Sequence, residues 1–195
     1  MTPEEVLSHF RESGALLEGH FLLSSGLHSD RYLQCARVLM HPKRAEILCA
    51  ALAQKVKETL GEDAVDYVVA PAMGGVVVGY EMARQLGVPG MFTERVDGVF
   101  TFRRGFELPA GSRVVMSEDI VTTGKSSKEC IAVIEQSGGK VVGATCLIDR
   151  SNGTADVGVP LFSLMGMDVK TYDPNDLPPH LAGTEAIKPG SRNLK

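Results

Sequence analysis

The chain has 195 residues, of which 44% are hydrophobic, 23% charged and 6% aromatic, and its formal net charge is −4. This composition is typical of a soluble globular protein with a buried core and excludes disordered and fibrous classes. The acidic balance without a basic stripe argues against nucleic-acid binding, and no apolar run approaches the roughly 20 residues that span a bilayer.

The first third of the chain predicts two helices separated by a hairpin. Thr2-Pro3-Glu4-Glu5 combines a capping Thr, a Pro at the first helical position and a Glu three residues after the cap. That pattern predicts a helix over residues 2–13. Two short apolar pieces around a Ser/Gly turn predict a small hairpin over residues 19–32. Pro42 begins a second helix that ends at Gly61.

The middle of the chain alternates strands and helices. Strands are predicted over residues 66–70, 89–93, 113–116 and 140–148, and helices over residues 76–86 and 124–136. Residues 94–106 are polar and alternate weakly, which is typical of a long β-ribbon or loop. This order predicts an α/β fold, an open, mostly parallel sheet with helices on both faces. After Asp173 the chain is rich in Pro and Gly and predicts an irregular surface tail.

The cysteines indicate a reducing compartment. Cys35, Cys49, Cys130 and Cys146 stand in apolar or helical stretches without a C-x-x-C pair, which favours buried thiols over a zinc ribbon or a redox dithiol. The acidic start Met-Thr-Pro-Glu-Glu is not typical of a signal peptide. We therefore expect a cytoplasmic protein whose single domain covers residues 1–195.

Residues 114–127 contain the stretch that points to a ligand. A buried strand ends in two adjacent carboxylates, Glu118 and Asp119, and a loop of Thr, Thr, Gly and Ser then opens a helix. Ligands of open α/β sheets bind at the carboxyl ends of strands, and helix N-termini attract anions. The hydroxyls and the glycine suit a phosphate monoester, and the two acids suit vicinal hydroxyls. The stretch predicts a site for a ribose 5-phosphate.

A P-loop is the obvious alternative, because Gly124-Lys125-Ser126 matches the end of that motif. The P-loop pattern requires glycine at position 119, and the carboxylate of Asp119 would repel a phosphate there. A G-x-G-x-x-G motif is absent, so a dinucleotide-binding fold has no support. An ordinary capped crossover explains Thr122 or Thr123 but not the two acids before them.

Two acids, two apolar residues and T-T-G-x-S together resemble the signature of the type I phosphoribosyltransferases, which bind 5-phosphoribosyl-1-pyrophosphate (PRPP). The resemblance implies that family's fold, with a small N-terminal hood built from about residues 1–40 and the C-terminal tail. It implies that Glu118 and Asp119 meet the ribose 2′ and 3′ hydroxyls. The other implied PRPP-binding residues are Ile120, Val121, Thr122, Thr123, Gly124, Lys125 and Ser126 in the loop, and Met73 and Gly74 in a pyrophosphate turn.

Further stretches resemble the orotate-specific branch of the family. These are the base-binding hood (21–29), the pyrophosphate loop (70–75), the mobile catalytic loop (92–95 and 103–106), the strand end with the orotate-binding arginine (148–150), and two parts of the tail (172–174 and 188–192). The resemblance implies that Ser25, Gly26, Thr122 and Arg150 bind orotate. Taken alone, Arg150 could equally form a surface salt bridge to Asp149 or a neighbour.

The implied reaction converts orotate and PRPP into orotidine 5′-monophosphate and pyrophosphate, a step of pyrimidine biosynthesis. Many members carry Lys where this chain has Ser24, and Lys and His in the mobile loop. This loop offers Arg95, Arg103 and Arg104, which with Asp119 are the expected catalytic residues. Mg²⁺ is the expected cofactor, held mainly by PRPP, with Glu118 and Asp119 as indirect ligands.

The resemblance also implies a homodimer whose mobile loop is shared across subunits, with no nucleic-acid or membrane partner. Two other functions remain open: a phosphoribosyltransferase for another base, such as xanthine or guanine, and a non-enzymatic regulator that senses PRPP. The hood and Arg150 argue against another base. The chain has no spare length for a nucleic-acid-binding element, which argues against the regulator.

Overall fold

The protein, described here from a computed structural model for residues 1–23 and 25–189, is built on a six-stranded sheet of order β5-β4-β3-β6-β7-β8. All neighbouring strands are parallel except the antiparallel pair β4 and β5. The strands are β3 (Tyr67–Pro71), β4 (Gly90–Val96), β5 (Val99–Phe102), β6 (Arg113–Val121), β7 (Lys140–Asp149) and β8 (Leu161–Gly166).

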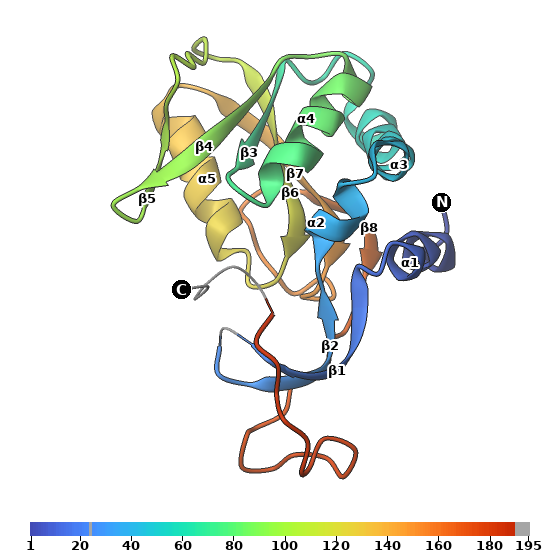
Figure 1. Ribbon diagram of the computed structural model, residues 1–195. Helices are drawn as coiled ribbons and strands as arrows, with labels where there is room; N and C mark the ends of the chain where they lie inside the picture. Colours follow the sequence, from blue (N-terminus) through green and yellow to red (C-terminus); the bar gives the residue numbers. More distant parts are fainter. Residues whose placement is uncertain (24, 190–195) are drawn as a thin grey trace.

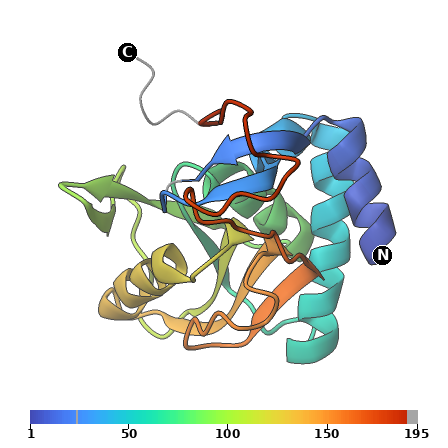
Figure 2. The ribbon, with the colours of Figure 1, turned by 90° about the horizontal axis from the view of Figure 1, so that it is seen from below.

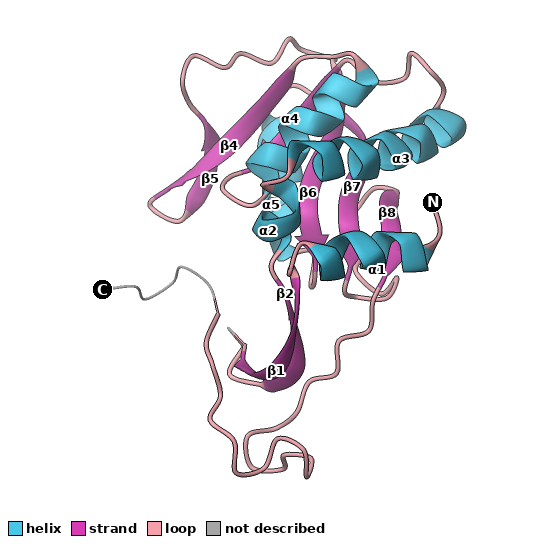
Figure 3. Cartoon of the chain, turned by 45° about the vertical axis from the view of Figure 1, so that its right-hand side comes forward, coloured by secondary structure: helices cyan, strands magenta, loops and turns pink. Residues whose placement is uncertain are grey.

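Helices cover both faces of this sheet, as the sequence predicted (Figures 1 and 3). The helices are α1 (Pro3–Glu12), α2 (Cys35–Leu39), α3 (Pro42–Leu60), α4 (Gly75–Leu86) and α5 (Lys125–Gln136). The first four share one hydrophobic cluster with the sheet, and α5 covers a second cluster on the opposite face. None of the helices within the described ranges is long and apolar enough to cross a membrane.

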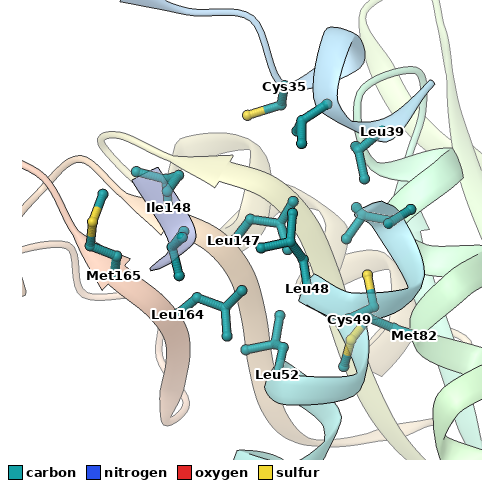
Figure 4. Packing of buried hydrophobic residues seen from close by; sticks show 14 of the residues in the cluster. Cys35, Leu39, Leu48, Cys49, Leu52, Met82, Leu147, Ile148, Leu164 and Met165 are labelled. Atoms are coloured by element: carbon teal, nitrogen blue, oxygen red, sulfur yellow. The ribbon is translucent and has the colours of Figure 1, made fainter. Parts of the chain in front are cut away.

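The larger cluster fixes α3 and α4 against the sheet. Figure 4 shows Leu48 and Leu52 of α3 and Met82 of α4 beside Leu147 of β7, and all four side chains are fully buried. Because both faces of the sheet are covered, its central strands are apolar along nearly their whole length. Polar residues near the carboxyl ends of these strands therefore need an explanation other than packing, and they indicate where a site could lie.

Helix α4 lies unusually close to β3. A Cβ added at Gly79 would stand 2.5 Å from the Cβ of Ala70, so only glycine permits this approach. The close contact fixes the start of α4, and with it the turn of Met73 and Gly74, beside the end of β6.

A second, two-stranded sheet lies beyond the carboxyl ends of β6 and β7 (Figure 1). It is the antiparallel hairpin of β1 (Leu16–Leu22) and β2 (His28–Leu33). The C-terminal segment runs along it (Figure 2), with bridges from Phe21 to Ile187 and from His28 to Tyr172. Two predicted features, Ser24 and the tail residues 190–192, lie outside the described residues.

The predicted elements are present, with one correction to the strand that carries the acids. The predicted strand over 113–116 is too short, because β6 continues to Val121 and pairs with β7 as far as Asp149. Glu118 and Asp119 are therefore strand residues and do not follow the strand. Two adjacent charges usually end a buried strand. Here Glu118 still pairs with Cys146 of β7, and the carbonyl of Asp119 accepts from the Sγ of Cys35 at 4.0 Å. The sequence prediction also missed α2 and the edge strand β8.

Candidate active site

The two acids of β6 lie on opposite faces of the sheet, because consecutive residues of a strand alternate. Glu118 accepts a hydrogen bond from the Oγ of Ser127, in the first turn of α5. Asp119 faces the start of α4, where a Cβ added at Gly74 would stand 3.1 Å from its Oδ1. The strand thus presents one carboxylate to each of two helix N-termini.

Burial raises the pKa of both acids. For Glu118 the pKa is raised to about 7; burial is the largest cause and the charge of Asp119 adds to it, while the Ser127 hydrogen bond and the charge of Arg95 oppose it. Burial also raises the pKa of Asp119, against a 2.9 Å hydrogen bond from the backbone N–H of Ile120. Neither acid forms an ion pair with another described residue. The pair therefore suits a ligand that brings hydroxyl donors or positive charge.

The predicted phosphate loop is the turn from β6 into α5. Thr122, Thr123 and Lys125 are exposed there, and Gly124 has a left-handed backbone with φ of +74°. A Cβ at Gly124 would also stand 2.9 Å from Val157 Cγ1, so glycine is required on both counts. The N–H of Lys125 donates to the Oγ1 of Thr123 at 3.4 Å, but Gly124 provides no capping side chain, so the N–H groups of Ser126 and Ser127 are available to an anion.

The predicted pyrophosphate turn joins β3 to α4. Met73 is 82% exposed, Gly74 is exposed, and the Ala72–Met73 peptide bond is cis. The contact between Gly74 and Asp119 brings this turn to the acids of β6, although the two segments are far apart in the sequence. The structure therefore gathers both predicted PRPP-binding segments at one edge of the sheet.

Arg150 follows β7 and lies half-buried beside the phosphate loop, with its backbone N–H donating to the carbonyl of Val121 at 2.8 Å. Its Nε is buried and has no hydrogen-bond partner among the described residues. Burial lowers the pKa of the guanidinium, while Tyr32 and Cys35 oppose the shift. The alternative salt bridge to Asp149 is wrong, because Ser151 and Gly153 occupy that carboxylate.

The predicted base-binding residues of the hood form no hydrogen bonds with the other predicted base-binding residues within the described chain. Ser25 and Gly26 are exposed at the tip of the β1–β2 hairpin, and no hydrogen bond joins them to Thr122 or Arg150 within the described chain. The sequence analysis did not assign a role to Tyr32 of β2, which opposes the lowering of the Arg150 pKa. The sequence predicted that this residue lies in the hairpin, but it could not predict the direction of its side chain.

The predicted catalytic arginines lie on or just after the ribbon of β4 and β5, which projects from the sheet (Figure 3). Arg95 donates to the carbonyl of Gly98 at 2.6 Å, pairs with Glu129 of α5, and lies 3.9 Å above the ring of Phe100. These three contacts hold Arg95 against the neighbouring turn and α5.

Arg103 and Arg104 differ in their partners. Arg104 forms a two-bond ion pair with Glu94, with both distances 2.9 Å. Arg103 is exposed and forms no ion pair with any residue in the described ranges. Of the three arginines, Arg103 is the one that is free to meet a ligand without breaking a contact of this chain.

Three comparisons relate the chain to known proteins. Residues 38–164 match the family model described as the phosphoribosyl transferase domain. The chain is 58% identical over 192 residues to an orotate phosphoribosyltransferase of Rhizorhabdus wittichii, covering 98% of this chain and 97% of the relative. It is 56% identical over 195 residues to one of Caulobacter vibrioides, with both chains fully covered. The crystal structure of orotate phosphoribosyltransferase from Aeropyrum pernix matches with a TM-score of 0.67 at 27% identity, over 83% of this chain and 93% of that one.

Replacing Glu118 with Gln is expected to raise the melting temperature of the ligand-free protein by a few degrees at about pH 8. The folded pKa of about 7 lies above the ordinary 4.5, so the carboxyl group contributes stability below pH 4.5 that is lost as the pH rises through 7. The glutamine still accepts from Ser127 but carries no charge to desolvate.

Thermal unfolding at about pH 8 and about pH 4 tests this expectation, since the difference between the two proteins should vanish at the lower pH. Glu135→Gln, at an exposed position of the same helix as Ser127, is the control and should show no such pH dependence. A Glu118→Gln protein that is destabilised equally at both pH values would contradict the argument.

Proposed function

Because the chain belongs to the phosphoribosyl transferase domain family, and within it to the orotate phosphoribosyltransferases, we propose that it transfers the phosphoribosyl group of PRPP to orotate. The products are orotidine 5′-monophosphate and pyrophosphate, in a pentosyl transfer that serves pyrimidine biosynthesis. The single observation that carries the choice of base is the buried Nε of Arg150, which has no hydrogen-bond partner in the described parts of the chain.

An unpaired guanidinium at a strand end favours an anionic base. Orotate carries a carboxylate, which a guanidinium binds through two parallel hydrogen bonds. A neutral purine would leave the half-buried charge of Arg150 unpaired, and such a site rejects ligands that lack the matching group. We assign Ser25, Gly26 and Thr122 to the remaining edge of the base.

The PRPP-binding roles follow from the chemistry of the groups at the sheet edge. Glu118 and Asp119 accept the ribose 2′ and 3′ hydroxyls, and residues 120–126 hold the 5-phosphate at the N-terminus of α5. Met73 and Gly74 bind the pyrophosphate through their backbone. The contact of Gly74 with Asp119 supports this assignment, because it sets the pyrophosphate turn beside the ribose acids.

In the proposed reaction, N1 of orotate forms a bond to C1 of the ribose while the bond from C1 to the pyrophosphate oxygen breaks. The proton that N1 loses is taken up by the departing pyrophosphate. The electron pair leaves with the pyrophosphate, and positive charge develops on the ribose ring. No nucleophilic side chain is required, so catalysis comes from positioning and from charge neutralisation. Of the two acids, Asp119 is the one beside the pyrophosphate turn. Its negative carboxylate would stabilise the positive charge that develops on the ribose ring.

We place Arg103 on the departing pyrophosphate, since it has no acidic partner among the described residues. Arg95 and Arg104 could join it only by leaving Glu129 and Glu94, to which they are paired. Closure of the ribbon over the site would also exclude water from the reacting sugar.

The residues at the site fit a Mg²⁺ ion that is held mainly by the substrate and only in part by the protein. Glu118 and Asp119 supply hard oxygen ligands, but no group of three or more possible protein ligands occurs within the described residues. The substrate would therefore provide most of the coordination. When bound, the ion neutralises charge on the pyrophosphate.

We further propose a homodimer in which the ribbon serves the partner's site. Beside the pyrophosphate turn, α4 exposes Val77 and Tyr80, which are 49% and 71% exposed, next to Met73. A second copy of the chain is the occupant that would cover this apolar face and bring its ribbon to the site. All four cysteines are free and buried, which supports a cytoplasmic location.

The direct test is the fall in ultraviolet absorbance when the protein is mixed with orotate, PRPP and Mg²⁺. We expect turnover only when all three are present, and none when adenine, guanine or xanthine replaces orotate. Turnover of a purine in place of orotate would overturn the choice of base. Saturable PRPP binding without turnover of any base would instead support a PRPP-sensing regulator.

Arg150→Ala is expected to raise the KM for orotate about 10- to 100-fold, because it removes a charge-assisted pair of hydrogen bonds. The KM for PRPP should change little, since the side chain does not meet the phosphates. Steady-state kinetics with each substrate varied separately provides the measurement. Arg11→Ala, which removes an exposed arginine of α1, is the control. Equal rises in both KM values would mean that Arg150 does not bind the orotate carboxylate.

Mixing two inactive variants tests the shared ribbon. Arg103→Ala and Asp119→Asn should each abolish most turnover alone. In an equimolar mixture that exchanges subunits, about a quarter of the sites should be intact if each ribbon completes its partner's site in a twofold dimer. Activity should therefore recover to about that fraction. A mixture as inactive as its components, with subunit exchange verified, would mean that each ribbon serves its own subunit.

A further inference from the structure

Asp149, the last residue of β7, is a buried carboxylate whose oxygens are all engaged. It is 5% exposed. Its Oδ1 accepts from the backbone N–H of Ser151 at 2.8 Å and from the Oγ of Ser151 at 2.6 Å, and its Oδ2 accepts from the N–H of Gly153 at 2.8 Å. A buried carboxylate without such donors would be costly, so these contacts define the turn that follows β7.

The hydroxyl of Ser151 extends this arrangement along the chain. Its Oγ accepts from the backbone N–H of Ala155 at 2.8 Å, while its carbonyl accepts from the Oγ1 of Thr154 at 2.8 Å. The carboxylate therefore fixes the whole segment 150–155, which we call the β7 turn.

The end of the β7 turn supports the phosphate loop. A Cβ placed on Gly124 would stand 3.7 Å from Ala155 Cβ, 3.5 Å from the carbonyl oxygen of Asp156 and 2.9 Å from Val157 Cγ1. Val157 itself is 2% exposed, so it is a firm packing surface. The left-handed backbone of Gly124, on which the start of α5 depends, lies against this segment.

The start of the β7 turn holds Arg150. Its backbone N–H is bound to Val121 of β6, and the carbonyl of Asp149 accepts from the N–H of Met167 at 2.8 Å. Since Ser151, the next residue, is bound twice to Asp149, the backbone is fixed on both sides of the arginine. The direction of the Arg150 side chain therefore depends on the carboxylate.

We propose that Asp149 is a positioning residue for both substrates: through the β7 turn it directs Arg150 toward the base and supports the loop that binds the 5-phosphate. This inference rests on the proposed function, because it concerns how that site is held together. Asp149 touches neither substrate, since its oxygens are occupied. In this proposal, one buried carboxylate fixes the position of Arg150 relative to the phosphate loop.

Asp149→Asn tests the proposal with nearly unchanged volume. The amide group presents N–H donors where one carboxylate oxygen accepted, so either Gly153 or Ser151 faces a donor and the β7 turn shifts. We expect the KM values for orotate and PRPP both to rise about tenfold, as expected for misplacement of binding groups. Arg150→Ala, by contrast, should change the orotate value alone.

Asp66→Asn is the matched control. Asp66 also accepts three hydrogen bonds, all from Arg113, at the opposite end of the sheet. Its loss should lower the melting temperature without changing either KM. If Asp149→Asn lowers the melting temperature but leaves both KM values at the wild-type level, Asp149 is structural only and the proposal is wrong.

Two milder variants keep the test decisive if Asp149→Asn does not fold. Ser151→Ala removes the connection to Ala155 and should raise the KM for PRPP more than that for orotate, because it loosens the part of the turn beside Gly124. Ser151→Thr keeps the hydroxyl and should restore the wild-type value. Equal kinetics for Ser151→Ala and wild type would overturn the proposal. A wild-type protein inactive with orotate and PRPP would instead refute the proposed function, which separates the two failures.

Discussion

The site depends on two carboxylates held at the end of a buried strand without cationic partners in the described chain. Burial raises the pKa of Glu118 to about 7, and that of Asp119 is raised by the same cause. The protein without a ligand therefore carries an electrostatic cost that a ligand with hydroxyl donors or positive charge would remove. The alternation of β6 sends the acids to opposite faces, toward the starts of α4 and α5, where we propose that pyrophosphate and 5-phosphate bind separately.

Much of this arrangement could be predicted from the sequence because it is local. The order of two acids, hydroxyls and Gly124 defines a strand, a turn and a helix start, and the alternation of elements defines the sheet. The true end of β6 could not be predicted in this way. It depends on the pairing of Val121 with Asp149, a contact between distant segments, and local patterns treat adjacent charges as the end of a buried strand.

The ion-pair partners of the ribbon arginines could not be predicted either, because they too depend on contacts between distant segments. Arg95, Arg103 and Arg104 have the same chemistry in the sequence, but their partners are set by tertiary packing. Glu129 lies on a helix 34 positions after Arg95, and no periodicity connects them. The ion pairs are partly exposed and individually weak, so a substrate pyrophosphate could compete for either arginine. The ion pairs that hold Arg95 and Arg104 are therefore compatible with the role that we propose for the ribbon, in which its arginines bind pyrophosphate.

Asp149 and Arg150 are adjacent in the chain, yet they differ in whether their buried polar atoms have hydrogen-bond partners. Both carboxylate oxygens of the aspartate have partners in the same turn, whereas the buried Nε of the arginine has none within residues 1–23 and 25–189. A folding requirement explains the first, because a buried carboxylate must be satisfied. It does not explain the second, because an unpaired buried donor lowers stability. In the function that we propose, orotate supplies the missing partner of the arginine, and the satisfied carboxylate beside it keeps the arginine in place.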